Sequence, residues 1–227
     1  MKKVKFMIPI LILACVILAV SLLLARCSGG DEQKSPPPAL EDVRDELILR
    51  IENSKQVNDI FWGEGLPVIK IGSPEADEFG LYTEENSILT DDYGAWEYVD
   101  PSKTSIISVD AIKMLAESAY SDTFLKGVYT AQFDGLYDPV TVTVLDPHYY
   151  EDEVWIWKNS NSEEEFPSVA VKREFDYSSI KMKESASSDE RIVITIDSYP
   201  EGKTEVEVLT FTFDKQEDGW YLSSPTY

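Results

Sequence analysis

The longest apolar run of the chain lies at its N-terminus. Residues 6–25 form 20 consecutive uncharged, mostly apolar positions, and Lys2, Lys3 and Lys5 precede them. A helix of that length spans about 30 Å, the thickness of a bilayer core. Lysines stay on the cytoplasmic side, so the pattern predicts a membrane-inserted N-terminal helix that places all later residues outside the cytoplasm.

The next segments repeat at helical spacing. Apolar residues recur every three or four positions through 39–59, with acids early and Gly63 and Gly65 after the end, which predicts an amphipathic helix of about five turns. Residues 66–105 contain many breakers and predict an irregular stretch. Ser108 is a good N-cap for a second helix to about Tyr120, followed by a further turn through 121–126.

From Gly127 onward the apolar period changes to two, which predicts strands. The candidate strands are 128–133, 140–145, 153–158, 169–175, 179–183, 191–197, 205–213 and 220–223. The links 184–190 and 214–219 are short enough for antiparallel hairpins. In 205–213 the alternation changes phase at Val208 and Leu209, where we expect a bulge. Helices followed by antiparallel strands predict an α+β domain with its helices packed on one sheet face.

The chain therefore divides into three parts: an anchor or lipoprotein signal at 1–27, a flexible tether at 28–38 rich in Ser, Gly and Pro, and an α+β domain at 39–227. Leu24, Ala25 and Cys27 resemble a bacterial lipoprotein box, in which the cysteine is lipidated. Arg26 departs from that box, so an uncleaved signal anchor with Cys27 as a plain thiol stays open as the alternative. Both arrangements predict a domain on the extracytoplasmic face of the cell membrane.

The net charge of the chain limits the classes of partner that it can bind. The chain has 20 basic and 42 acidic residues, a net charge of −22. The first 27 residues hold four of the basic residues and no acid, so the remainder carries 20 − 4 = 16 basic residues and a net charge of −26. Nucleic acid is excluded as a partner because phosphates need Lys and Arg. Such a domain repels anionic headgroups and attracts basic protein surfaces.

The sequence contains few combinations of residues that could form a catalytic or metal site. His148 is the chain's one histidine and lies in a predicted turn, 146–150, which indicates a surface position without a catalytic partner. The chain has too few His and Cys residues to form a zinc site, and none of its acidic segments has the spacing of an EF-hand calcium loop. No phosphate-binding glycine motif is present. A glycosidase pair of carboxylates stays open, but no pair is singled out. We therefore expect no cofactor and no enzymatic activity.

Aromatic and acidic residues remain as candidates for recognition. Trp155 and Trp157 alternate with Val154 and Ile156, so both tryptophans face one side of a strand and either complete the core or line a pocket. Loop-like segments with acids offer a partner surface. Its candidate residues are Trp96, Tyr98, Tyr149, Tyr150, Glu151, Asp152, Glu153, Glu163, Glu164 and Glu165.

The order of these pieces resembles the NTF2-like or cystatin-like superfamily: a long first helix, an aromatic region, a second helix ending near Tyr120, then a meander closing in 218–221 and 225–227. Residues 93–99, 105–120 and 219–227 are similar to exported Gram-positive proteins that include inhibitors of cell-wall D,L-endopeptidases. This resemblance implies a curved sheet under the helices. It also implies a non-enzymatic binding domain whose partner is a cell-wall hydrolase or another basic protein. Two alternatives stay open: a small-molecule sensor or carrier, and an enzyme acting on a small hydrophobic substrate through His148, Tyr149 and Tyr150.

Overall fold

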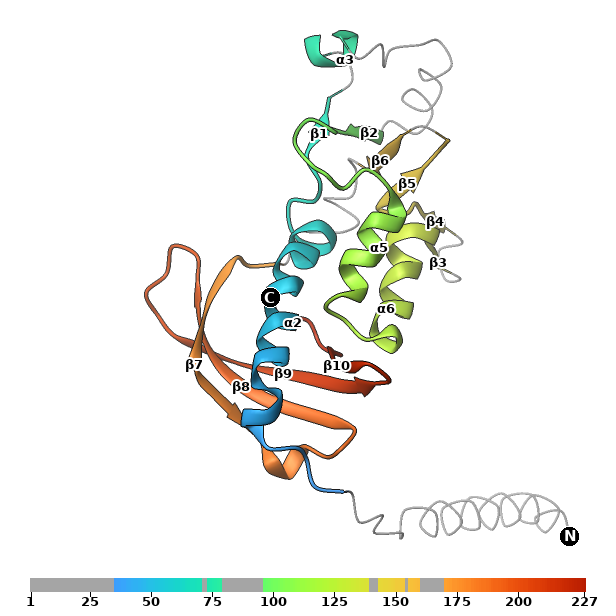
Figure 1. Cartoon of the computed structure of the whole chain (residues 1–227). Coiled ribbons are helices and arrows are strands. Elements are labelled where there is room, and N and C mark those ends of the chain that lie inside the picture. The colour runs from blue at the N-terminus through green and yellow to red at the C-terminus, as the bar shows by residue number, and fades with distance from the viewer. Residues whose placement is uncertain (1–34, 71–72, 79–95, 139–142, 154, 160–169) are drawn as a thin grey trace, which may run out of the picture. The chain divides into compact units, whose positions relative to one another are not determined.

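Helices dominate the first half of the described chain and antiparallel strands the second, which confirms the α+β prediction (Figure 1). The computed structural model describes residues 35–70, 73–78, 96–138, 143–153, 155–159 and 170–227. The predicted anchor at 6–25, Cys27 and the first part of the tether lie outside these residues. Within the described ranges, no helix combines the length and apolarity needed to cross a membrane.

The first helix, α2 (Leu40–Trp62), is the predicted amphipathic helix and ends three residues later than expected. It begins directly after the three prolines 36–38, which cannot continue a helix, and ends at Gly63. Its buried positions follow helical spacing through Val43, Leu47 and Ile51 to Phe61. This stripe faces the inner side of the larger sheet (Figure 1).

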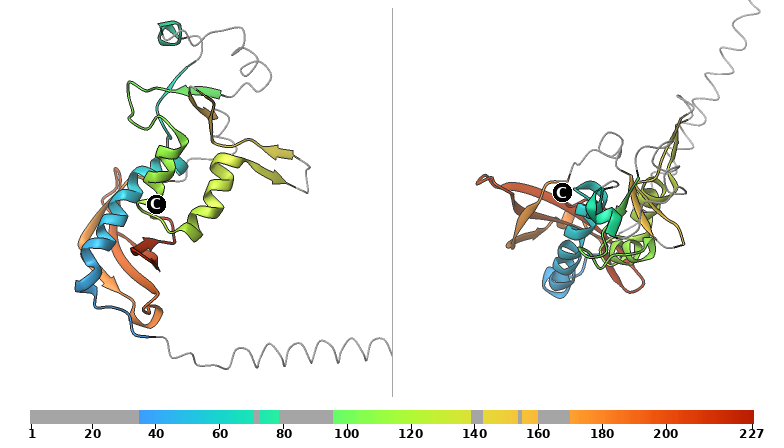
Figure 2. Two further views of the ribbon diagram at one scale, coloured as in Figure 1. Left: turned by 45° about the vertical axis from the view of Figure 1, so that its right-hand side comes forward. Right: turned by 90° about the horizontal axis from the view of Figure 1, so that it is seen from above.

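The larger sheet is an antiparallel meander of four strands in the order β10-β9-β8-β7. The inward residues alternate along the strands, and Ile192, Ile194, Ile196, Phe211 and Phe213 are fully or almost fully buried. Figures 1 and 2 show α2 lying along this sheet. Its strands are β7 (Arg173–Met182), β8 (Arg191–Pro200), β9 (Glu207–Gln216) and β10 (Gly219–Leu222).

Two predictions about this sheet were wrong. The strands expected at 169–175 and 179–183 are one strand, β7, with a register shift between Asp176 and Lys181. The bulge expected at Val208 and Leu209 does not occur, because the pairing of β8 with β9 runs unbroken through both residues. Val208 is an exposed apolar residue on the outer face of the sheet. An apolar residue on the exposed face interrupts the alternation of apolar and polar positions, as a bulge would.

A smaller sheet and a separate hairpin precede the meander. The order of the smaller sheet is β1-β2-β6-β5, all antiparallel. Two of its strands lie where the sequence predicted an irregular stretch, and a third covers Tyr149 and Tyr150, where we expected a turn. The strands are β1 (Val68–Ile69), β2 (Trp96–Val99), β5 (Tyr149–Glu151) and β6 (Ile156–Asn159), with β3 (Leu136–Asp138) and β4 (Thr143–Leu145) in the hairpin.

Among the described residues, three further helices precede the meander. α3 (Pro74–Glu78) is short, and α5 (Val109–Glu117) is the predicted second helix, capped by the Ser108 side chain. The predicted strand at 128–133 is wrong: α6 (Asp122–Tyr129) runs through it into a π-helical turn, η1 (Thr130–Asp134). The reason is a second serine cap, because the Ser121 hydroxyl accepts from the Phe124 amide at 3.4 Å.

Side chains of α2 fasten both edges of the larger sheet. Glu46 accepts the Trp220 amide of β10 at 2.7 Å, and the Arg50 Nε donates to the Trp220 carbonyl at 3.0 Å. At the opposite edge, Arg44 donates to the Tyr177 carbonyl of β7. Gly219 has a φ of 154°, and a Cβ there would collide with the Glu46 carboxylate. A glycine is therefore required where the helix meets β10.

Candidate functional site

The aromatic residues of the smaller sheet sort onto its two faces. Trp157 lies directly opposite Tyr98 in β2 and Tyr150 in β5, so these three side chains share one face. Tyr149 lies on the other face with Ile156, in the main core. The two apolar faces predicted for 153–158 are confirmed: Ile156 packs in the main core, and Trp157 in a second cluster with Tyr98 and Ile69.

This second cluster is packed rather than hollow at its centre. The Tyr98 and Trp157 rings are 3.8 Å apart between centroids, and both side chains are buried. Trp155 meets the edge of Tyr98 at 5.7 Å. Trp155 and Trp157, the predicted pocket residues, therefore take part in aromatic packing.

Two of the predicted recognition acids stabilise the fold. Asp152 accepts the Trp155 amide at 2.7 Å and the Trp157 indole N–H at 2.9 Å, so it orders the turn between β5 and β6. Glu151 accepts the Val109 amide at 2.8 Å, at the N-terminus of α5. Glu153 is exposed. Glu163, Glu164 and Glu165 lie outside the described residues.

His148 and Tyr149 are buried, which corrects the surface position predicted for the histidine. The His148 Nδ1 lies 2.9 Å from the Gln132 Oε1, and burial, with a smaller effect of Lys158, lowers the pKa of His148 to about 3. The Tyr149 hydroxyl accepts the Leu66 amide at 3.0 Å and donates to the Ile60 carbonyl at 3.1 Å. Burial raises the pKa of Tyr149 far above its ordinary value. Both side chains hold the end of α2 and the chain that follows it.

The remaining predicted residues form an exposed patch, which we call the Tyr150 surface. Trp96 and Tyr150 meet edge to face at 6.1 Å, and Tyr150 is 48% exposed. Glu151 points to the opposite face of the smaller sheet, where it contacts the start of α5, and Ile107, two residues before Val109, is 61% exposed. The Tyr150 surface comprises Trp96 and Tyr150, with the exposed Glu153 in the turn that follows β5.

A cavity of about 300 Å³ lies elsewhere, between the second half of α2, the start of β7 and Thr226. We call it the α2–β7 cavity. Three cations line it, Lys55, Lys172 and Arg173, against one acid, Asp59. None of these residues was among the predicted site residues. The available indication was the pair Lys172-Arg173 directly before a strand in a chain poor in basic residues.

Arg173 is the most buried cation of the α2–β7 cavity, with a side chain 10% exposed. Its Nη1 donates to Glu207 at 2.6 Å and to the Ser198 hydroxyl at 3.2 Å. The hydrogen bond from Arg173 lowers the pKa of Glu207, so that carboxylate is ionised at neutral pH. The Arg173 Nε is buried and has no hydrogen-bond partner among the described residues.

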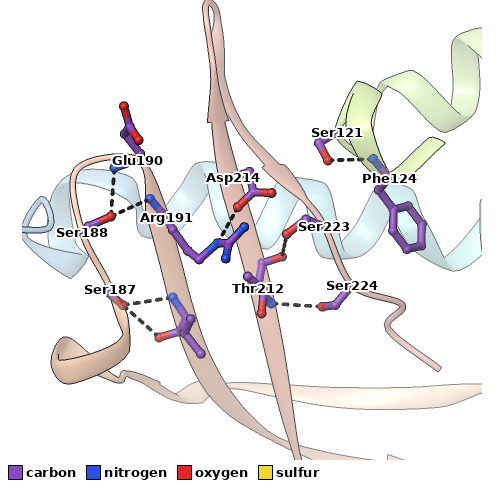
Figure 3. Close-up of polar contacts among 11 residues, drawn as sticks. Ser121, Phe124, Ser187, Ser188, Glu190, Arg191, Thr212, Asp214, Ser223 and Ser224 are labelled. Carbon is purple, nitrogen blue, oxygen red and sulfur yellow. Dashed lines mark hydrogen bonds and ion pairs between the residues drawn. The ribbon is translucent and has the colours of Figure 1, made fainter. Parts of the chain in front are cut away.

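A serine-rich cluster at the far end of the larger sheet is fully engaged in structural contacts (Figure 3). The Ser188 hydroxyl accepts the Glu190 and Arg191 amides, and Arg191 pairs with Asp214 at 2.7 Å. Ser224 accepts the Thr212 amide at 3.0 Å. Because the chain's single histidine bonds to Gln132, none of these serines has a histidine base.

Metal chemistry finds no support in the described ranges, where no group of three His, Cys, Asp or Glu side chains is placed to hold an ion. The Tyr150 surface and the α2–β7 cavity are candidate sites for function. No family model, no curated protein and no solved structure matches the chain.

Proposed function

We propose that the chain is a non-enzymatic binding domain, held on the extracytoplasmic face of a cell membrane by residues 1–27, that binds a basic protein such as a cell-wall hydrolase. The observation that carries the proposal is the Tyr150 surface: two aromatic side chains in edge contact, followed in the chain by the exposed carboxylate of Glu153. Tyr and Trp are the residue types that contribute most to interfaces. The surrounding net charge of −26 steers a basic partner toward it.

The placement outside the cytoplasm rests on the sequence, on Lys2, Lys3 and Lys5 before the apolar run 6–25. Membership of the NTF2-like or cystatin-like superfamily is part of the same proposal. It is supported by one long helix packed on a four-stranded antiparallel meander. Inhibition of a wall hydrolase would follow if the acidic surface occupies a basic cleft.

The enzymatic alternative needs His148, Tyr149 and Tyr150 free for chemistry. His148 and Tyr149 are buried and committed to Gln132, Leu66 and Ile60. A general acid or base must reach the proton that it transfers. Binding is therefore the better supported function.

The test measures binding of the purified full chain to a basic cell-wall endopeptidase at 0.02, 0.15 and 1 M NaCl. The informative variant is Tyr150→Ser with Glu153→Gln, because both side chains are exposed and neither carries a contact that holds the fold. The matched control is Tyr199→Ser with Glu201→Gln, an exposed tyrosine and acid at the end of β8. Glu151 and Asp152 are kept, since their loss would disturb the hairpin itself.

We expect affinity to fall at least ten-fold between 0.02 and 1 M NaCl, where the Debye length shrinks to about 3 Å. The Tyr150 variant should weaken binding about ten-fold or more, and the Tyr199 control should leave it within two-fold. Binding that ignores salt, or equal losses in both variants, would remove the basis of the proposal.

A further inference from the structure

The α2–β7 cavity has the features of a small-molecule site, and its properties do not depend on the tether or on the Tyr150 surface. Its volume of about 300 Å³ is at the lower end of the range for ligand pockets. Ala170, Val171 and Phe175 supply apolar wall. Val171 is 43% exposed, so an apolar residue stands partly in solvent beside the cavity.

The floor of the cavity is rigid. Asn58 donates to the Thr226 hydroxyl at 2.6 Å and accepts the Tyr120 hydroxyl at 2.5 Å, and Ser54 lies 2.6 Å from the same threonine oxygen. These side chains are buried and satisfy one another. A site whose walls are fixed in advance loses little conformational entropy when a ligand binds.

The cations determine the charge of the ligand. Arg173 presents a buried guanidinium whose Nε has no partner among the described residues. Leaving a buried donor unpaired costs about 1–3 kcal/mol, and more on a charged group, so an acceptor oxygen is favoured there. Such an oxygen on a carboxylate also gains a charge-assisted hydrogen bond.

The two lysines differ in what they can offer. Lys55 donates to Glu52 at 2.9 Å and lies over the Phe175 ring at 5.3 Å, so it belongs to the wall. The Lys172 ammonium is 3.9 Å from Asp59 and 3.7 Å from Glu64, beyond hydrogen-bond distance, and it is 55% exposed. Its donors are available to an arriving anion, and Asp59 disfavours a second negative charge on the ligand.

We propose that the α2–β7 cavity binds a small monocarboxylate with an apolar body, the carboxylate meeting Arg173 and Lys172 and the body lying on Val171 and Phe175. A monocation of the same shape would place its charge beside the Lys172 ammonium and the Arg173 guanidinium, so it binds more weakly. A neutral analogue binds more weakly because it leaves the guanidinium donor without an anionic acceptor.

The test uses the full chain in an uncharged detergent and three fluorinated probes of similar shape: 4-fluorophenylacetate, 4-fluorobenzyl alcohol and 4-fluorophenethylamine. Fluorine NMR measures each dissociation constant, with a detergent-only sample as blank. The variant Arg173→Met with Glu207→Gln removes the guanidinium together with its partner acid. Its matched control is Arg191→Met with Asp214→Asn, which removes a comparable cross-strand pair outside the cavity (Figure 3).

We expect the acetate probe to bind at least ten-fold more tightly than the alcohol or the amine. The Arg173 variant should lose this preference, and the Arg191 control should keep it. Lys172→Met, on an exposed side chain, should weaken the acetate a few-fold without affecting folding, and it serves if the Arg173 variant does not fold. Equal binding of the three probes, an unchanged Lys172 variant, or no binding of the acetate would overturn the proposal.

Discussion

His148 makes the stability of the domain depend on pH. Its folded pKa is about 3, whereas an unfolded chain protonates histidine near pH 6.5. Between these values the unfolded state binds a proton that the folded state does not. The free energy of unfolding therefore falls as the pH is lowered from about 7, by up to about 1.4 kcal/mol per pH unit. Urea denaturation at pH 7, 6 and 5 measures this slope above the range where most carboxylates titrate.

The control is His148→Gln, which keeps a hydrogen-bonding side chain beside Gln132 and removes the only histidine of the chain. Its stability should change much less between pH 7 and pH 5. A wild-type chain equally stable at both values would show that His148 is protonated alike in the folded and unfolded states, contrary to its burial.

Tyr149→Phe tests the second buried polar residue. The change removes one hydroxyl and leaves the Leu66 amide and the Ile60 carbonyl unpaired in the core. We expect a loss of about 1–3 kcal/mol in the free energy of unfolding. Tyr199→Phe, at a tyrosine that is 37% exposed, should change it by less than about 0.5 kcal/mol. Equal effects of the two variants would contradict the role of the hydroxyl.

These two residues show where sequence reasoning stopped at the residue scale. A histidine and a tyrosine among acids favoured an exposed turn, but their partners are Gln132 and backbone atoms of α2 and the chain after it, up to 89 positions away. Tyr150, the residue after the buried Tyr149, is exposed as expected. Alternation along β5 produces that difference, and it appears only once the strand is recognised.

At the scale of elements, Glu46 and Arg50 make the hydrogen bonds that a neighbouring strand would make to β10. Glu46 accepts the Trp220 amide, and Arg50 donates to the Trp220 carbonyl. We expect Glu46→Ala to lower the hydrogen-exchange protection of the Trp220 amide at least ten-fold, while Glu46→Gln keeps most of it. Asp45→Ala, at an exposed acid one position earlier on α2, is the control. Unchanged protection in Glu46→Ala would mean that packing alone holds β10.

Elements with a strong period were predicted correctly, and several short ones were not. The buried residues of α2 recur at helical spacing over several turns, and those of β8 recur at every second position. The sequence therefore indicated a helix and a strand. The segment 128–133 has only a few apolar residues, and its helical state depends on the cap at Ser121 and on packing of Phe124, Tyr129 and Phe133 against the core. The short strands β1 and β2 are stabilised by their sheet partners, which local propensity does not contain.

At the scale of the whole molecule, a net charge of −22 opposes compactness. We expect the midpoint of urea unfolding to rise between 0.02 and 0.5 M NaCl, because salt screens repulsion among the acids more than it weakens the few ion pairs. Sucrose at equal osmolality controls for solvent effects. A midpoint that falls with salt would indicate that pairs such as Arg173–Glu207 outweigh the repulsion.

The net charge could be predicted from the composition, but the location of the cavity could not be predicted from the sequence. The α2–β7 cavity joins residues 55–59, 170–175 and Thr226, three segments that no local pattern connects. At the predicted pocket residues Trp155 and Trp157, the packing partner Tyr98 likewise comes from a distant strand, which no local pattern connects to them.

The fastening of α2 to β10 has a consequence for biosynthesis. Arg50 meets its Trp220 partner 170 positions later, so the helix leaves the ribosome long before the strand that secures it. Until then the cover of its apolar stripe is incomplete, and the nascent chain offers a binding site to holdase chaperones and proteases. Folding is thus expected to finish in one late step, when the last strand docks, rather than helix by helix during synthesis.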